Sequence, residues 1–149
     1  MMRLLVIVLL VLPYFLTGCR NSSADVPPEI IPGQDACDNC FMIINEKKYA
    51  AAVTLNNGEE KRFDDIGCAL AYIDQNKKNI MGYWVFDFLS GVPVPAKKAF
   101  FVRSSMEVTP MGSGLLAFSK KAAAETFAGR ENSKVLIFNE LTNNNLNKE

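Results

Sequence analysis

Hydrophobic residues alternate with polar ones, or recur at helical spacing, in eight segments between residues 48 and 138. The first four segments predict two strands, a helix and a strand, and the next four predict the same order again. In chain order they are strands at 48–55 and 59–63, a helix from Asp64 or Asp65 to about Asn76, strands at 83–89, 98–103 and 112–118, a helix at 120–128 and a strand at 134–138. This order predicts an α+β protein with two ββαβ halves, about 35–92 and 93–138, packed together.

Turn and capping residues stand between these segments. Asn56-Asn57-Gly58 predicts a tight turn between the first two strands, because its residues tolerate positive φ. The first predicted helix can be capped by the aspartate at its start, either Asp64 or Asp65. The second can be capped by Ser119 and is expected to end at Gly129. The rest of the chain, 139–149, is polar and rich in asparagine, so we expect a frayed C-terminal tail.

The N-terminal residues predict a targeting signal. Leu4 to Leu16 is an almost unbroken apolar run, too short for a comfortable membrane-spanning helix and typical of a signal peptide. The tetrad Leu16-Thr17-Gly18-Cys19 resembles the bacterial lipobox, in which the cysteine is lipidated. We therefore expect residues 1–18 to be a lipoprotein signal peptide, and the lipidated Cys19 to begin a flexible tether, 19–34. The mature protein would then be a membrane-anchored lipoprotein of the cell envelope, facing the periplasm or the cell exterior. A spanning anchor helix or an ordinary cleaved signal is the alternative.

Charge argues against nucleic acid as a partner. The chain has 16 lysines and arginines and 16 aspartates and glutamates, so its formal net charge is +0. Loss of the signal peptide removes only Arg3 from these residues, and the remaining chain has no basic field for nucleic acid. The sequence also contains no histidine. That absence excludes histidine-dependent catalytic triads and the iron and zinc sites that need imidazole ligands.

Three sulfur atoms lie within six residues, on Cys37, Cys40 and Met42. Thiolates and thioethers are soft ligands that select Cu(I) over harder divalent ions, so the cluster predicts a Cu(I) site. Three other interpretations stay open. A structural zinc site is one, although it needs a fourth cysteine or histidine ligand. The second is a redox disulfide between Cys37 and Cys40, and the third is a pair of structural cysteines with Met42 in the core.

Two further sulfur residues are candidate ligands. Met111 stands among a proline and glycines in the segment 109–114, which is not the setting of a helix-face core residue, although a partly exposed loop methionine is the alternative. Cys68 falls in the first turn of the first predicted helix, where the helix N-terminus would favour its thiolate. It is either an auxiliary copper ligand or a plain buried cysteine. The paired aspartates before it are better explained as helix cap and dipole partner than as catalytic groups.

Several motifs in one order resemble those of the NosL family. They are the lipobox, Cys-x-x-Cys-x-Met-x-Ile at 37–44, Phe-Asp-Asp-Ile-Gly-Cys-Ala-Leu-Ala-Tyr at 63–72 and Thr-Pro-Met-Gly-Ser-Gly at 109–114. The similarity spans about residues 35–138. Members of this family are membrane-anchored lipoproteins that carry Cu(I) during maturation of nitrous oxide reductase. The resemblance implies two ββαβ halves related to the fold of the organomercurial lyase MerB, without its lyase chemistry.

The resemblance also implies a ligand set and partners. Cu(I) would be bound by sulfur from Cys37, Cys40 and Met42, with Met111 contributed by the second half. Phe41 stands where many members have glycine, which makes the local turn less permissive but leaves the sulfurs in place. Partners would be the copper-enzyme maturation machinery, namely an ABC-type assembly complex of the periplasm and membrane, and nitrous oxide reductase.

We therefore expect a membrane-anchored Cu(I) metallochaperone that delivers copper for assembly of nitrous oxide reductase or a similar copper enzyme, without enzymatic turnover. The alternative is an extracytoplasmic thiol–disulfide oxidoreductase that uses Cys37 and Cys40, with the methionines dispensable. A third interpretation is a binding or scaffold lipoprotein whose cysteines are structural.

Overall fold

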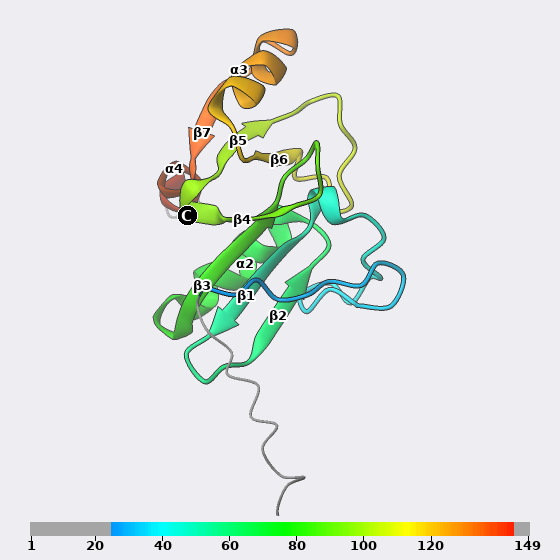
Figure 1. Ribbon diagram of the computed structural model, residues 1–149, viewed down its shortest axis with the longest axis vertical. Coiled ribbons are helices and arrows are strands. Elements are labelled where there is room, and N and C mark those ends of the chain that lie inside the picture. The colour runs from blue at the N-terminus through cyan, green and yellow to red at the C-terminus, as the bar shows by residue number, and fades with distance from the viewer. Residues whose placement is uncertain (1–24, 145–149) are drawn as a thin grey trace, which may run out of the picture.

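The computed structural model describes residues 25–144, which form two antiparallel sheets (Figure 1). The four-stranded sheet has the order β2-β1-β3-β4, with β1 (Ala51–Leu55), β2 (Glu60–Phe63), β3 (Ile80–Phe86) and β4 (Pro93–Pro95). The three-stranded sheet has the order β6-β5-β7, with β5 (Phe100–Arg103), β6 (Leu115–Phe118) and β7 (Val135–Ile137). The helices are α2 (Ile66–Asn76), α3 (Lys121–Arg130) and α4 (Phe138–Asn144), with short 3-10 helices η2 (Lys47–Tyr49), η3 (Lys77–Asn79) and η4 (Ala96–Lys98).

This element order confirms the predicted α+β class and the repeated ββαβ pattern. The first half runs β1-β2-α2-β3 and the second runs β5-β6-α3-β7. The turn at 56–58 joins β1 to β2 as predicted, and Gly58 there has a φ of 83°. The first sheet also gains β4, which follows the predicted boundary at residue 92, pairs with β3 and brings Pro95 opposite Trp84.

The central strand β1 is buried along its whole length because both faces of the sheet are covered. Helix α2 covers one face, where Val53 and Val85 pack with Ile66 and Leu70. The N-terminal segment crosses the other face, where Ile30 packs against Trp84 together with Ile44, Ala50, Ala52 and Phe86. Ile30 lies in the segment that we expected to be a flexible tether, so the folded domain begins before the predicted boundary at residue 35. The predicted signal peptide and Cys19 lie outside the described residues.

The two halves share one hydrophobic core and a polar joint at Asp87. Phe101, Leu115 and Phe138 of the second half pack in the same cluster as α2 and β1. Asp87 is buried after β3 and accepts a hydrogen bond of 2.6 Å from the Ser119 amide across the joint. Burial alone would raise the pKa of the Asp87 carboxyl, but hydrogen bonds from Ser119 and Ser90 hold it below its ordinary value. The carboxylate therefore stabilises the joint at neutral pH.

Three local predictions in the second half are wrong. Ser119 does not cap α3, because Lys120 holds the N-cap position and no side-chain hydrogen bond closes it. The helix passes through Gly129 and ends at Arg130. The tail that we expected to be frayed begins with α4, because Phe138 and Leu141 lie three residues apart on one helix face and are buried in the shared core. No helix within residues 25–144 is long and apolar enough to cross a membrane.

Gly114 offers a test of the contact that leads into β6. Its φ of 64° is a conformation that side chains rarely adopt, and an added Cβ would overlap the carbonyl oxygen of Ser104. We expect Gly114→Ala to lower the free energy of unfolding by about 2 kcal/mol or more in urea titrations. The matched control is Gly129→Ala in α3, which meets no atom within 4 Å and is expected to raise stability by up to about 1 kcal/mol. Equal effects of the two substitutions would contradict this account.

Candidate metal centre

Cys37 and Cys40 lie on a short hairpin formed by residues 33–44, here called the cysteine hairpin. Ala36 and Ile43 form an antiparallel bridge at its base. The Cys37 amide donates to the Met42 carbonyl at 2.8 Å, and the Phe41 amide donates to the Cys37 carbonyl at 2.9 Å. The tip therefore consists of the four residues from Asp38 to Phe41, with one thiol at its base and the other within the tip.

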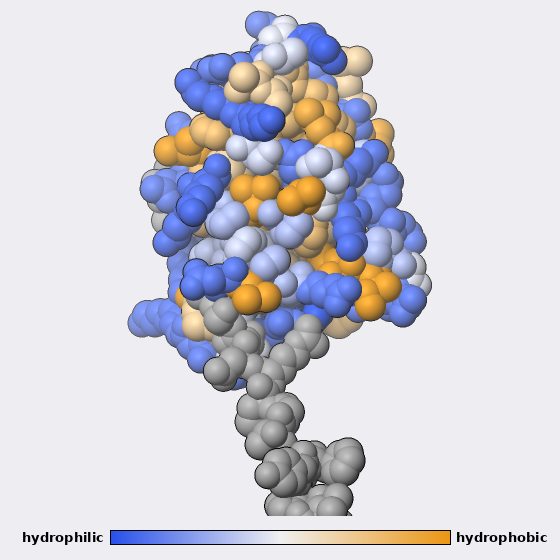
Figure 2. All heavy atoms as spheres, viewed as in Figure 1, coloured by the Kyte–Doolittle hydropathy of each residue, from blue (hydrophilic) through white to orange (hydrophobic). Residues whose placement is uncertain are grey.

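Phe41 closes this tip in a strained conformation. Its φ is 64°, in the left-handed region that glycine adopts freely and that costs another residue about 1–2 kcal/mol. The side chain is 81% exposed, so packing within the domain does not offset that cost. Met42 and Ile43 beside it are also exposed, and Figure 2 shows hydrophobic side chains gathered at the lower right, over the segment that Figure 1 colours blue to cyan.

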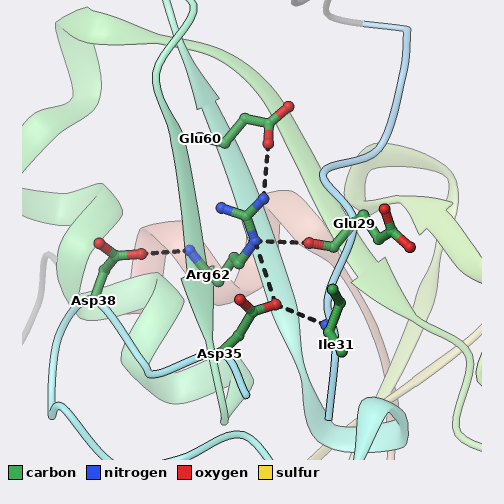
Figure 3. A network of polar contacts seen from close by, with 6 residues as sticks. All are labelled: Glu29, Ile31, Asp35, Asp38, Glu60 and Arg62. Atoms are coloured by element: carbon green, nitrogen blue, oxygen red, sulfur yellow. Dashed lines mark hydrogen bonds and ion pairs between the residues drawn. The ribbon is translucent and has the colours of Figure 1, made fainter.

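Arg62 of β2 fixes the cysteine hairpin to the edge of the first sheet (Figure 3). Its backbone pairs with Asp38 in both directions: the Asp38 amide donates to the Arg62 carbonyl at 2.8 Å, and the Arg62 amide donates to the Asp38 carboxylate at 2.7 Å. Its guanidinium donates to the Glu29 carbonyl at 2.6 Å and pairs with Asp35 at 3.7 Å and Glu60 at 2.8 Å. One side chain thus ties the strand to both the entering segment and the hairpin.

Four potential donor groups meet where β2 ends and α2 begins. The sulfur atoms of Cys37, Cys40 and Cys68 and one carboxylate oxygen of Asp64 all lie within 4.8 Å of one another. The Cys40 thiol donates to Asp64, 3.5 Å from both oxygens. All three cysteines are free thiols. The structure therefore brings together the three predicted cysteines, two from the cysteine hairpin and one from α2.

Asp64 is the member of this cluster that sequence reasoning missed. Either aspartate of the pair could have capped α2, and the structure gives that role to Asp65, which accepts from the Gly67 amide at 2.6 Å. Asp64 is then free to turn toward the thiols. The only signal in the sequence was the pair of aspartates itself, because one aspartate is enough to cap the helix and the other is left without a role. The structure shows that this remaining aspartate follows β2, the strand that pairs with the cysteine hairpin.

Burial sets the pKa of two thiols in the cluster. Cys37 and Cys68 are buried, whereas Cys40 is partly exposed. Burial raises the pKa of the Cys37 thiol to about 11, and it raises the pKa of the Cys68 thiol well above its ordinary value. The expectation that the helix N-terminus favours the Cys68 thiolate is therefore wrong, because desolvation outweighs the helix dipole. Since a metal binds the thiolate, its entry must displace protons from this cluster.

The two candidate methionines lie on segments that border the cluster. The Met111 amide donates to the second oxygen of Asp65 at 3.1 Å, so the segment 109–114 is held against the start of α2. A Cβ on Gly67 would lie 2.6 Å from the Cβ of Ser113, which shows how closely the two elements approach. The side chains of Met42 and Met111 are 49% and 48% exposed. Their role as ligands stays a prediction, as does lipidation of Cys19, which lies outside the described residues.

The thiol environments predict an order of alkylation in reduced, metal-free protein. With its pKa raised from 9.0 to about 11, Cys37 has roughly a hundredfold less thiolate at pH 8 than an ordinary cysteine. We expect iodoacetamide to modify Cys40 first, and the rate of alkylation at Cys37 to keep rising with pH beyond 9. Peptide mass spectrometry measures the order and the rates of modification. The control is protein unfolded in urea, in which the three thiols should react at similar rates. A Cys37 rate that levels off near pH 9 in the folded protein would contradict this.

Comparison with known proteins identifies the family and the fold. The model of the NosL family matches residues 28–146. The crystal structure of the copper chaperone NosL from Shewanella denitrificans superposes with a TM-score of 0.66 and 21% sequence identity, over 76% of this chain and 93% of that one. No match is found among curated proteins. At this identity the superposition shows the shared fold, whereas the family model covers most of the sequence. The chain therefore belongs to the NosL family.

Proposed function

We propose that this protein is a Cu(I) metallochaperone, held at a membrane by lipid on Cys19, that delivers copper for assembly of nitrous oxide reductase or a similar copper enzyme. The observation that carries the proposal is the convergence of three free thiols from two separate elements, with donor atoms within 4.8 Å of one another. The family and the similarity to a copper chaperone structure support it.

Cu(I) is the ion that these donors favour. Three thiols form a soft ligand set, and Cu(I) accepts two or three soft ligands without an octahedral shell. The sequence has no histidine to complete an imidazole site. Asp64 is a hard donor, so we assign it to the Cys40 thiol as a hydrogen-bond acceptor rather than to the ion.

The gradient of exposure across the sulfurs suits a carrier that must release its cargo. Cys37 and Cys68 are buried, Cys40 is partly exposed, and the two methionines are half-exposed. Buried thiolates supply affinity, whereas a neutral thioether at the surface is a weaker ligand that a partner can displace. A partner that exchanges ligands with Cu(I) would first meet the methionines and then Cys40.

The raised pKa of the Cys37 thiol disfavours Cys37 as the attacking thiol in the oxidoreductase alternative. Attack on a disulfide requires a thiolate, and the pKa of about 11 leaves Cys37 almost fully protonated at neutral pH. Burial raises the pKa of Cys68 as well. A metal ion, in contrast, displaces these protons by binding directly to sulfur, so the same environment is compatible with a carrier of copper.

Cu(I) titration against a competing chelator under reducing conditions tests the proposal. We expect about one Cu(I) per protein, and a loss of affinity of roughly a hundredfold or more in the Cys37→Ala, Cys40→Ala double variant. Met42→Leu and Met111→Leu should each weaken binding by roughly tenfold. The matched control is Met106→Leu, because Met106 is 75% exposed on the loop after β5 and should leave the affinity unchanged. Wild-type affinity in the double variant would refute the proposal.

Asp64→Asn separates a hydrogen-bond acceptor from a metal ligand. When Cu(I) takes the place of the Cys40 proton, the carboxylate loses its donor and faces a thiolate. An amide of the same shape can donate to that thiolate, so we expect Cu(I) affinity within about threefold of wild type, or tighter. The same chelator competition measures it, with circular dichroism as the check on folding. A tenfold weaker affinity in a folded variant would place the carboxylate among the ligands.

A further inference from the structure

A groove lies at the edge of the first sheet that is farthest from the cysteine hairpin. It has a volume of about 440 Å³ and is lined by Asp25, Ile80, Met81, Gly82, Tyr83, Trp84, Pro95, Lys97 and Lys98. Trp84 is only 8% exposed, and its indole nitrogen has no hydrogen-bond partner among the residues that the structure describes. The groove thus combines two cationic side chains, an aromatic wall and an unused buried donor.

A second pair of lysines stands at the same end of the sheet. Lys77 and Lys78 lie in η3, directly before β3, and the carbonyl of Asn79 in the same helix accepts from the Asn56 amide at 2.8 Å. Lys97 and Lys98 follow β4 past the point where Pro95 pairs with Trp84, which brings them alongside the first residues of β3. All four lysines are exposed, and we call them the basic face.

Two carboxylates lie among these lysines. Asp74 pairs with Lys77 at 2.5 Å, and Asp25 lines the groove. The basic face therefore keeps an excess of two positive charges in a chain whose formal net charge is +0. Such a local excess favours contact with an anionic surface without making the whole protein basic.

The chain length before the groove limits its distance from a lipid on Cys19. Asp25 is six positions after Cys19 in the sequence, and fully extended chain over those six steps spans at most about 22 Å. The groove is therefore tethered close to any bilayer that holds the acyl chains. In Figure 1 the described chain begins, in blue, beside β3, and then crosses the sheet toward the cysteine hairpin on the right.

The metal centre lies diagonally across the same sheet. Strands β2 and β4 are opposite edges, about 14 Å apart at the usual strand spacing. The cluster forms where Phe63 ends β2 and pairs with Ala51, whereas the groove forms where Ile80 begins β3 and pairs with Leu55 at the other end of β1. A surface that meets the basic face would leave the cysteine hairpin pointing away from it.

We propose that the basic face docks on the anionic phospholipid headgroups of the membrane that holds the anchor, and so presents the metal centre to partners on the far side. The inference rests on the proposed lipid anchor at Cys19. Each lysine near an anionic surface contributes roughly a fivefold preference, and the attraction decays within a Debye length of about 8 Å at physiological salt. A short tether makes this contact intramolecular, so weak individual attractions suffice to orient the domain.

Trp84 provides a native probe, because it lines the groove and is the single tryptophan in the chain. The lipidated full-length mature protein is placed in vesicles of phosphatidylcholine, with or without phosphatidylglycerol, that carry a headgroup-attached quencher. We expect stronger quenching of Trp84 with phosphatidylglycerol, and its loss at high salt. Lys97→Gln with Lys98→Gln should lower the docked fraction relative to the undocked by roughly tenfold or more. The matched control pair, Lys120→Gln with Lys121→Gln at the start of α3, should leave it unchanged.

The outcomes separate this inference from the copper proposal. Equal quenching of the lipidated protein in both vesicle types, or equal effects of the two lysine pairs, would overturn the docking surface. The Cu(I) affinity of the same protein in detergent would still test the carrier function. A mature protein without acyl chains on Cys19, shown by mass spectrometry, overturns the anchor and the docking surface together. If inorganic phosphate changes the fluorescence of Trp84 as much as phosphatidylglycerol does, the groove binds a free anion. If the fluorescence changes with protein concentration, the groove binds a second copy of the chain. Either result overturns docking on lipid.

Discussion

The junction between β2 and α2 is the constraint on which the metal centre depends. Asp64 and Asp65 are both buried there, and burying two adjacent carboxylates is unfavourable unless each accepts hydrogen bonds. Asp65 uses one oxygen for the Gly67 amide at the start of α2 and the other for the Met111 amide of the second half. Its neighbour accepts from the Cys40 thiol. Two consecutive residues therefore set the positions of the helix that carries Cys68, the segment that carries Met111 and the cysteine hairpin.

Gly67 shows how tightly this junction joins the two halves. Its missing side chain lets Ser113 approach the first turn of α2, where a Cβ would come within 2.6 Å of the serine Cβ. The hydrogen bond from Met111 to Asp65 crosses the same contact. The segment 109–114 is thus placed by the first half, although it belongs to the second. A ββαβ half alone would lack either the thiols or this segment, which gives a structural reason for the two halves to share one core.

Local sequence patterns predicted the elements of this fold well, because turn residues and apolar spacing act over a few neighbouring residues. The spacing of Cys37 and Cys40 indicated a candidate metal site among other interpretations, whereas whether Cys68 joins them depends on how α2 packs, which the sequence left open. The pKa of the Cys68 thiol could not be predicted, because its position in the helix indicates the dipole but not the depth of burial. The same limit explains Asp64 and Arg62, whose partners lie on the cysteine hairpin 24 residues away in the sequence. Helix α4 was missed because two apolar residues in a polar tail suffice once a core is available to receive them.

Phe41 is the residue whose conformation the fold does not explain. The hairpin tip requires positive φ, and glycine would adopt it without the cost of about 1–2 kcal/mol that a side chain incurs. The exposed ring makes no contribution to the core that could offset this cost, and it lies between Cys40 and Met42. Backbone strain that no nearby contact offsets indicates that the residue is retained for function rather than for the stability of the domain. If the candidate metal centre faces away from the membrane, as the proposed basic face predicts, this ring is among the first side chains that an approaching partner would meet. The exposed ring would then exclude water beside Cys40 and Met42, the sulfurs that the proposed copper transfer would use.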